Sequence, residues 1–291
     1  VRLVGSEMCI RDRRVGVYFN IAHNENKITE MPDNYIEENY TFGNGNYAYR
    51  REEGRPMGSF YGYRYKGVYQ NKDATYARDI EGNVMKDISG NAIVMRNGSY
   101  TVAPGDAIYE DVNHDGVINQ YDIVYLGNSN PRLTGGAGLN VSYKQFKLSA
   151  IFYGRYGQDV VNATRLNNES MRGIDNQSTA VLRRWRNEGD QTDIPRALYG
   201  EGYNTLGSDR FVEDASYLRL KSLSFTYRLP KKAIQRWGFN NIDVYVTGYN
   251  LFTWTNYTGQ DPEVKTENTY AKDTATTPAS IQLVAGFNLS F

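Results

Sequence analysis

One stretch of the chain places oxygen-bearing side chains at the spacing of a calcium-binding loop. Residues 111 to 122 read D-V-N-H-D-G-V-I-N-Q-Y-D. Calcium is held by carboxylate, amide and carbonyl oxygens, and a glycine at the sixth position of such a loop permits the sharp turn between them. The predicted ligands are the side chains of Asp111, Asn113, Asp115, Asn119 and Asp122, together with the main-chain carbonyl of Val117. The sequence therefore nominates Ca²⁺ as a structural cofactor.

Two features of this loop leave a second interpretation open. Its last position is Asp122, where a glutamate would bind bidentately, and the following I-V-Y-L-G is a strand pattern and not the second helix of an EF-hand. Turns rich in Asp and Asn also form without a metal, because their side chains accept hydrogen bonds from neighbouring main-chain N–H groups. The alternatives are a bound cation and a metal-free turn held by its own side chains.

The rest of the chain shows no spacing typical of a reactive centre. His23 and His114 are too few and too far apart for a zinc site or a triad, and H-E-x-x-H, G-x-S-x-G and Walker sequences are absent. No pair among the many carboxylates is singled out by its spacing. Residues 181 to 186, V-L-R-R-W-R, predict a short basic helix whose Trp185 packs into a loop. We expect no enzymatic activity.

Composition narrows the class of protein. The 33 basic residues balance 33 acidic ones, which argues against a nucleic-acid binder with its basic surplus. No run of apolar residues is long enough for a membrane helix, but strands that cross a membrane need only half their residues apolar. The 25 tyrosines suit membrane interfaces and sugar-binding surfaces, and tyrosine is also a good strand former. Composition leaves those readings open.

The last twelve residues carry the clearest strand pattern, S-I-Q-L-V-A-G-F-N-L-S-F. Successive residues of a strand point to opposite faces, so one face is apolar and the other polar, with Val284 the only apolar residue on the polar side. The apolar face consists of Ile281, Leu283, Ala285, Phe287, Leu289 and Phe291. Twelve such residues are enough for a tilted strand to cross a bilayer, and a closing aromatic is typical of outer-membrane barrels.

Similar patterns predict further strands. The predicted strands are residues 15–28, 58–69, 132–143, 146–157, 217–229, 242–254 and 280–291. Lys144 and Gln145 form a two-residue turn, and Pro230 ends a strand because it has no N–H to donate. Residues 231–237 predict one or two helical turns. Residues 242–254 carry apolar side chains on both faces, so their two sides stay unassigned.

The connections between these strands alternate in length. Short links at 144–145 and 230–241 alternate with long ones at 158–215 and 257–279. Outer-membrane barrels place short turns in the periplasm and long loops outside, which leaves Phe291 on the periplasmic side. Upstream the alternation fails by one strand. Either residues 58–69 do not span, or a strand between 84 and 128 escapes the prediction.

The first thirteen residues stand apart from these patterns. Residues 1–13 read V-R-L-V-G-S-E-M-C-I-R-D-R, and most of this stretch resembles the read-through translation of a sequencing adapter. We assign them to a non-native, adapter-derived segment and exclude them from the fold. Because the only cysteine, Cys9, lies here, thiol chemistry does not enter the prediction.

Five stretches carry a family resemblance as a set. They are G-S-F-Y-G-Y (58–63), P-G-D-A-I-Y-E-D-V-N-H-D-G-V-I-N (104–119), L-G-N-S-N-P-R-L-T-G-G (126–136), R-F-V-E-D-A-S-Y-L-R-L-K (210–221) and G-Y-N-L-F-T-W-T-N-Y-T-G-Q-D-P-E-V (248–264). Residues 14–291 resemble the C-terminal part of the SusC/RagA family of TonB-dependent outer-membrane transporters. The resemblance implies a twenty-two-stranded barrel with a plug inside, a SusD-like lipoprotein over the outer mouth, and energy supplied through TonB. It implies import of glycan oligosaccharides or, in some members, peptides.

The chain departs from the family in extent. The plug, the TonB-contacting segment and most strands are absent, so we expect a fragment whose last strand lacks its closing partner. The predicted fold class is all-β: an antiparallel transmembrane β-barrel portion, present as an open curved sheet with long extracellular loops. Its expected location is the bacterial outer membrane, in contact with lipid.

Three functions compete. The leading hypothesis is the barrel part of such a transporter, in which tyrosines of the loops, for example Tyr199 and Tyr203, stack on sugar faces. The alternative is a secreted calcium-containing β-sandwich that binds or processes carbohydrate, whose apolar faces would meet in one dry core. A passive porin shares the wall of the transporter and differs only in the quoted motifs.

Overall fold

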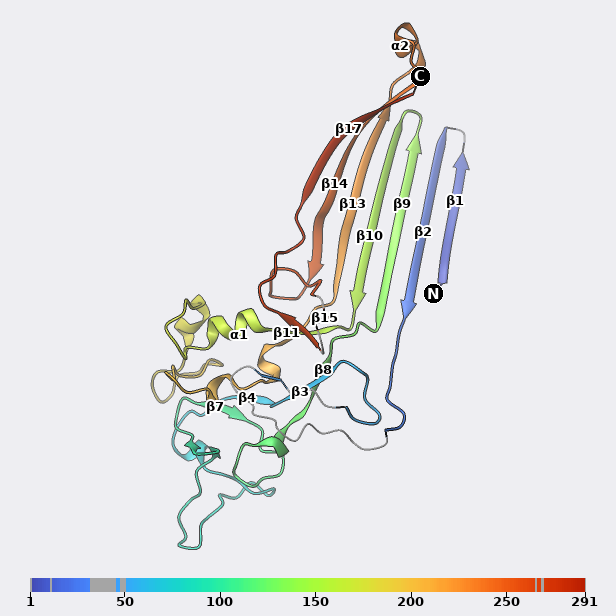
Figure 1. The fold of residues 1–291 in the computed structure, drawn as a ribbon. Coiled ribbons are helices and arrows are strands. Elements are labelled where there is room, and N and C mark those ends of the chain that lie inside the picture. The colour runs from blue at the N-terminus through green and yellow to red at the C-terminus, as the bar shows by residue number, and fades with distance from the viewer. Residues whose placement is uncertain are drawn as a thin grey trace.

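The computed structural model describes residues 2–10, 12–31, 46–47, 51–264, 266–267 and 270–290. Seven long antiparallel strands form one open sheet, which stands upright in Figure 1. In order across the sheet they are β1 (Arg2–Ile10), β2 (Arg13–His23), β9 (Leu133–Tyr143), β10 (Phe146–Tyr156), β13 (Tyr217–Arg228), β14 (Asn241–Thr255) and β17 (Gln282–Ser290). Every strand but the edge strands β1 and β17 pairs on both sides, so the sheet does not close on itself.

Short connections lie at one end of this sheet and long ones at the other, as the alternation in sequence predicts. Lys144 and Gln145 join β9 to β10, and Lys144 adopts the left-handed conformation (φ 52°) that a tight turn requires. The helix α2 (Lys231–Ile234) and a 3₁₀ turn (Gln235–Trp237) join β13 to β14 at the same end (Figure 1). The predicted helical turns after Pro230 are therefore present. Phe291 lies outside the described residues.

Residues 58–69 do not belong to the large sheet. They form two short strands, β3 (Ser59–Gly62) and β4 (Tyr65–Val68), which pair with β8 (Val124–Asn128) and β7 (Ala107–Tyr109). All four residues of β3 are buried, so both of its faces pack against protein. The alternating tyrosines of this segment therefore do not mark a spanning strand. Because β2 pairs directly with β9, no further strand stands between these two, and the directions alternate across the described strands of the sheet.

The excluded N-terminal segment takes part in the sheet. Residues 2–10 form the edge strand β1 in antiparallel register with β2, where Arg2 stands opposite Ile21 and Ile10 opposite Arg13. Excluding residues 1–13 from the fold was therefore wrong at the level of backbone pairing. That residues 1–13 are non-native stays a prediction.

The remaining described residues form a loop body at the long-loop end of the sheet (Figure 1). We define it as the described part of residues 24–132, 157–216 and 256–281. It holds a four-stranded sheet ordered β12 (Val212–Asp214), β11 (Asp159–Asn162), β16 (Tyr270–Asp273), β15 (Thr266–Glu267), the pair β5 (Arg96–Asn97) and β6 (Tyr100–Thr101), and the helix α1 (Ala163–Glu169). Short 3₁₀ turns complete it at residues 73–75, 120–122, 179–183, 203–205 and 209–211.

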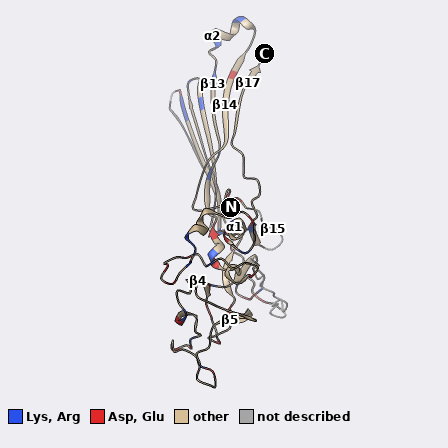
Figure 2. Ribbon diagram, turned by 90° about the vertical axis from the view of Figure 1, so that its left-hand side faces the viewer, with Lys and Arg blue, Asp and Glu red and all other residues tan. Residues whose placement is uncertain are grey.

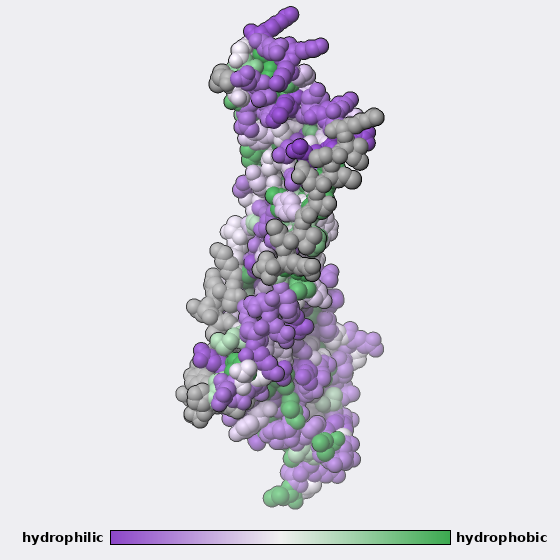
Figure 3. Space-filling model, turned by 90° about the vertical axis from the view of Figure 1, so that its right-hand side faces the viewer, coloured by the Kyte–Doolittle hydropathy of each residue, from purple (hydrophilic) through white to green (hydrophobic). Residues whose placement is uncertain are grey.

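Most buried apolar side chains lie in this loop body and not in the large sheet. The largest cluster consists of Tyr63, Tyr69, Ala77, Met95, Val102, Ala107, Tyr109, Ile118, Tyr203 and Leu206. Many of the tyrosines are therefore core residues, with ring pairs such as Tyr63 and Tyr109 at 5.6 Å between centroids. On the face drawn in Figure 3 the surface of the loop body is largely hydrophilic, with some apolar side chains at the tip farthest from the sheet. The loop body thus folds around its own core and does not use the apolar face of the sheet.

Candidate pore wall and outer loop body

The register of the large sheet places its apolar side chains on one face. Leu148 stands between Val141 of β9 and Phe225 of β13, and Val246 and Ala285 continue this row across β14 and β17. Residues paired directly across neighbouring strands project to the same face. The apolar surface is therefore continuous across these five strands.

These apolar side chains are exposed. Phe287 is 66% and Leu283 75% exposed, and within the described residues no second sheet covers them. A β-sandwich would bury such groups between two sheets, so the sandwich alternative is wrong. Apolar surface of this extent is unfavourable in water and is accommodated by lipid. No described helix is long and apolar enough to cross a membrane.

The opposite face of the sheet carries polar side chains that bond to one another across strands. The Ser149 hydroxyl donates to Oδ1 of Asn140 at 2.7 Å, and the hydroxyls of Ser224 and Thr247 lie 2.8 Å apart. Charged residues of the sheet gather toward its two ends, and its middle is drawn almost wholly tan in Figure 2. A hydroxyl and amide lining of this kind keeps water in place along a wall.

Pairing also assigns the two sides of β14, which the sequence leaves open. Val244 and Val246 fall on the apolar face, because they stand opposite Tyr227 and Phe225 of β13. Thr247 falls on the polar face with Ser224. The ambiguity arises from aromatic residues of β14 that line the polar face, which periodicity alone cannot separate from lipid-facing ones.

A β-bulge shifts the alternation within β13. The pairing with β10 passes from Ser222 directly to Leu220, so Lys221 is the extra residue of the bulge. On the N-terminal side of the bulge, Leu220 and Leu218 lie on the apolar face, opposite Phe252 and Trp254 of β14. Bulges of this kind bend a strand and turn its side chains, and this one directs Lys221 toward Glu263 of the loop body at 2.8 Å.

An ionic cluster, which we call the Arg219 cluster, joins the sheet to the loop after β14. Arg219 is almost fully buried; it donates through Nη1 to Glu263 at 2.8 Å and through Nη2 to Asp261, and its Nε donates to Thr253 at 2.9 Å. Burial raises the pKa of Asp261, but the main-chain N–H groups of Ala279 and Glu263 and the Arg219 guanidinium outweigh it, so the pKa is lowered. Arg219 lies in the stretch R-L-K and its two carboxylate partners lie in the stretch D-P-E, but nothing in the sequence indicates that these two stretches meet.

Further buried ion pairs hold the loop body together. Glu169 of α1 forms ion pairs with Arg165 at 3.0 Å and with Arg210 at 2.9 Å. Arg165 also forms an ion pair with Glu213 at 3.2 Å. These contacts join α1 to β12 and the turn before it. Because breaking one partner of such a pair leaves an uncompensated charge, the cluster fixes one arrangement of these segments.

The motif P-G-D at 104–106 has a structural role. Asp106 is fully buried and accepts hydrogen bonds from Arg196 Nε at 2.7 Å and from the Tyr100 hydroxyl at 2.7 Å. Gly105 (φ +88°) lies under Trp185, where a Cβ would come within 2.3 Å of the indole ring. The prediction that Trp185 packs into a loop is therefore confirmed, although the helical turn ends before it, at Arg183.

The candidate calcium loop is held by its own side chains. Asp111 Oδ2 accepts the Gly116 N–H and Asp115 Oδ1 the Val117 N–H, both at 2.8 Å, and Asn119 Nδ2 reaches the Val117 carbonyl at 3.1 Å. The side chains of Asn113 and Asp115 also meet, at 2.9 Å. These contacts match the metal-free turn, and a 3₁₀ turn followed by β8 replaces the second helix of an EF-hand.

Asp122 lies at the inner end of this loop. Its carboxylate accepts the N–H groups of Val112 and Asn119, both at 2.8 Å. Burial raises its pKa, and the charges of Asp111 and Asp115 act in the same direction. Within the described residues no group of three or more His, Cys, Asp or Glu side chains is arranged to hold a metal ion. Calcium binding at Asp111, Asn113, Asp115, Val117, Asn119 and Asp122 stays a prediction.

The two loop tyrosines named for sugar stacking differ in position. Tyr199 is 77% exposed, whereas Tyr203 is 3% exposed and packs against Tyr100 and Tyr109 with centroids at 5.2 and 5.4 Å. Tyr203 is a core residue, so its proposed contact with a sugar is wrong. The sequence signal was the same for both, because burial depends on segments far apart in the chain.

The loop body also contains a polar hollow of about 410 Å³ beside α1. Its lining residues are Asn162, Thr164, Arg165, Asn168, Glu169, Ser178, Arg183, Thr258, Gly259, Gln260, Asp273 and Ala275. Its carboxylates are already bonded, Glu169 to Arg165 and Asp273 to the Tyr257 hydroxyl. The exposed groups left to a ligand are amides, hydroxyls and the Arg183 guanidinium.

Comparisons with known proteins agree with this architecture. TonB-dependent receptor P3 of Formosa agariphila is 33% identical over 257 residues, which cover 86% of this chain and 23% of the receptor. TonB-dependent receptor P26 of the same organism is 30% identical over 248 residues, covering 84% of this chain and 23% of that receptor. A scan against protein-family models gives no match.

Solved structures show the same fold. The RagAB peptide transporter matches with a TM-score of 0.73 and 25% identity over 99% of this chain and 28% of that chain. The RagAB peptide importer in its closed-closed state matches with 0.72 and 25% identity, over 99% and 29%. The chain therefore spans about a quarter of the length of these relatives. The predicted fold class is confirmed, and the chain belongs to the TonB-dependent receptors of the SusC/RagA type as part of their transmembrane β-barrel.

Proposed function

We propose that this chain is the C-terminal barrel part of a SusC-like outer-membrane transporter that imports oligosaccharides or peptides together with a SusD-like lipoprotein and draws energy through TonB. The observation that supports it most is the two-faced sheet with a folded loop body at one end only. The solved structure of the RagAB peptide transporter has this fold and covers nearly the whole chain. Transport, and not catalysis, is the activity that this arrangement serves.

In this proposal each part of the chain has a place. The apolar face of the sheet contacts lipid, and the polar face lines the lumen, where hydroxyl and amide groups hold a wet path for cargo. The loop body lies at the extracellular mouth, because barrels carry their long loops on that side. Its own core and buried ion pairs keep it folded, so it presents a fixed surface to the lipoprotein.

The polar hollow beside α1 is the place where cargo would meet this part of the mouth. Asn168 and Gln260 are exposed and their side chains offer both donors and acceptors. Arg183 adds a cation that suits a carboxylate of a peptide or of an acidic sugar. Hydrogen-bonding groups of this kind orient a ligand and set its specificity.

Uptake by whole cells tests the proposal. Cells that produce the full-length receptor are given labelled oligosaccharides and labelled peptides, with a receptor deletion as the control. We expect receptor-dependent uptake of one of the two classes, and its loss when a protonophore collapses the proton gradient that TonB uses. Uptake that persists under the protonophore would support the passive porin instead.

A pair of variants connects uptake to this chain. Replacing both Arg183 and Gln260 with alanine is expected to reduce uptake several-fold while the receptor still reaches the outer membrane. The control is Lys232→Ala in α2 at the short-turn end, where no cargo contact is proposed. Unchanged uptake in the double variant removes the hollow from the proposal, and co-purification of the full-length receptor with the neighbouring lipoprotein tests the partner separately.

A further inference from the structure

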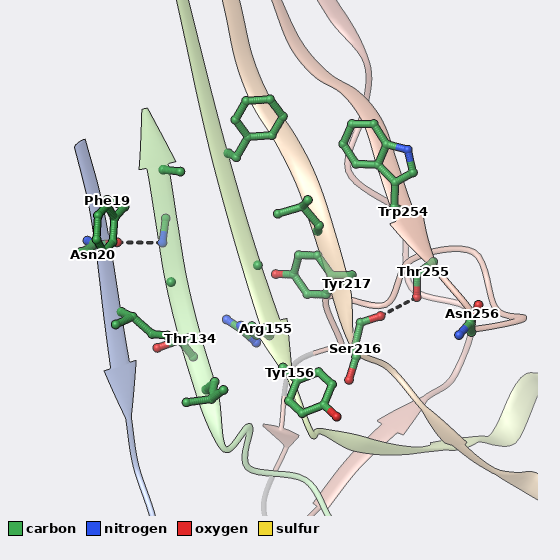
Figure 4. A pocket seen from close by; sticks show the side chains of 18 residues that line it. Phe19, Asn20, Thr134, Arg155, Tyr156, Ser216, Tyr217, Trp254, Thr255 and Asn256 are labelled. Atoms are coloured by element: carbon green, nitrogen blue, oxygen red, sulfur yellow. Dashed lines mark hydrogen bonds between the residues drawn. The ribbon is translucent and has the colours of Figure 1, made fainter. Parts of the chain in front are cut away.

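An apolar hollow of about 690 Å³ lies in the lipid-facing side of the sheet, close to the loop body (Figure 4). Its floor is formed by Gly135 and Gly154, which stand directly opposite each other in β9 and β10. A Cβ at Gly135 would lie 2.8 Å from the Asn20 carbonyl oxygen, and one at Gly154 2.8 Å from the Tyr217 carbonyl oxygen. Side chains on the floor are therefore excluded by the pairing of the strands, and the depression is built into the backbone.

Large apolar side chains surround this floor. Ile21 of β2 and Leu218 of β13 flank the glycine pair in the same row, because they are the register partners of Gly135 and Gly154. Phe152, Tyr156 and Trp254 complete the wall, and the last two are 62% and 52% exposed. The walls thus present flat rings around an open furrow.

One end of the hollow is polar. Ser216, Thr255 and Asn256 line it where the sheet meets the loop body, and the Thr255 hydroxyl donates to the Ser216 carbonyl at 2.8 Å (Figure 4). The hollow therefore has a long apolar part and a short polar edge on the side of the outer mouth. A ligand that matches it has an apolar tail and a polar head at the level of the membrane surface.

We propose that this hollow binds one acyl chain of an outer-membrane lipid, with the lipid head at the polar edge. The hollow is continuous with the face of the barrel that lipid covers, so acyl chains are the molecules that meet it first. Its volume lies in the range of small-molecule sites. Lipid tails are as apolar as the walls, so binding depends on close packing in a furrow that would otherwise stay poorly filled. All the lining strands are neighbours within this chain, so the rest of the barrel is not needed to complete the site.

Photolabelling of the purified full-length receptor in detergent tests the site directly. The probe is a long-chain fatty acid with a diazirine on its tail, and labelled peptides are mapped by mass spectrometry. We expect the label to concentrate on residues 152–156, 216–218 and 254–256. Phe225 and Phe287 are also exposed on the apolar face but lie outside the hollow, and they should carry less label. Labelling spread evenly over the apolar face overturns the proposal.

A matched pair of variants tests occupancy. Ala137→Trp places an indole at the edge of the hollow, whereas Ala285→Trp adds the same group to the same face on β17, outside it. Native mass spectrometry should show a lipid retained by the unmodified receptor and by Ala285→Trp, and a several-fold smaller retained fraction in Ala137→Trp. Equal lipid retention in both variants contradicts the proposal. Loss of a receptor dimer in Ala137→Trp without loss of lipid also contradicts it, because that result would show that a second copy of the receptor occupies the hollow.

Discussion

Arg219, on the polar face of β13, donates a hydrogen bond of 2.8 Å from Nη1 to Oε2 of Glu263, 44 residues further along the chain. The side chain of Arg219 is 3% exposed, and its Nη2 donates a second hydrogen bond to Asp261. One buried cation thus ties the loop after β14 to the barrel wall. A buried cation between two carboxylates fixes the position of this loop, and the more exposed Lys221 adds a second contact to Glu263 at 2.8 Å.

Replacing Arg219 with methionine is expected to release this loop. Asp261 would then lose the Arg219 guanidinium and Glu263 would keep only the more exposed Lys221, a loss on the order of 3 to 5 kcal/mol for attachment of the loop. The measurement is the rate at which a protease cuts residues 256–264 in the full-length receptor. The control is Arg228→Met on the same strand, whose pair with Asp243 at 2.7 Å is exposed at the other end and contributes about 0 to 1 kcal/mol. Equal cleavage in both variants contradicts the role of Arg219.

Attachment of the same loop should weaken in acid. The pKa of Asp261 is lowered in the folded protein, so its contribution is fully present above the unfolded pKa of about 3.9 and disappears as the pH falls through the folded value. Asp261→Asn should therefore increase cleavage of residues 256–264 at pH 7 and make progressively less difference as the pH falls below about 4. An acid-stable protease is needed at the lower end. A difference that stays constant down to pH 3 would assign the effect to shape and not to charge.

Local patterns in the sequence predict the wall of the barrel better than they predict the loop body. The wall strands β9, β10 and β17, and β13 above its bulge, follow period two, and the turn at Lys144 and Gln145 and the stop at Pro230 depend only on nearby residues. The bulge at Lys221 breaks the period because the loop body and not the strand determines where that side chain goes. Residues 58–69 mislead for a related reason, since burial on both faces gives the same alternation of tyrosines as a spanning strand.

Long-range contacts account for what the sequence could not show. Arg219 and Glu263 each lie in a stretch of the family resemblance, but nothing local says that they meet. Tyr199 and Tyr203 are four residues apart and chemically identical, yet one is exposed and the other is packed against Tyr109. Such assignments require the tertiary structure, because each depends on a partner distant in the chain.

Calcium binding to the loop at 111–122 has a thermodynamic signature. If the loop takes the ion, calcium at about 100 times its dissociation constant should stabilise the folded loop by about 2.7 kcal/mol, seen as slower hydrogen exchange there in the full-length receptor. Asp111→Asn with Asp115→Asn should abolish the effect, because both carboxylates leave the ligand set. Calorimetry of the receptor provides the second measurement. No heat and no change in exchange up to millimolar calcium would establish the metal-free turn.

The two tyrosines provide a test of cargo contact in the loop body. Tyr203→Ala should destabilise the loop body by about 3 to 5 kcal/mol, because it removes a ring from the core. Tyr199→Ala should leave stability unchanged, since that side chain is exposed, and should lower uptake only if it stacks on cargo. Proteolytic stability and uptake are measured for both variants. Normal uptake in Tyr199→Ala would exclude stacking at this position.

The direction of the apolar face can be tested on β17, where neighbouring residues point to opposite sides. Phe287 lies on the apolar face opposite Val244, and Asn288 lies on the polar face opposite Asp243. Phe287→Arg should cost on the order of 2 to 4 kcal/mol near the middle of the bilayer, whereas Asn288→Arg faces water and a carboxylate and should be tolerated. The readout is the fraction of full-length receptor that folds in the outer membrane, followed by heat-modifiable migration on a gel. If the arginine at 288 prevents folding and the one at 287 does not, lipid lies on the other face and the assignment of lipid side and lumen side is reversed.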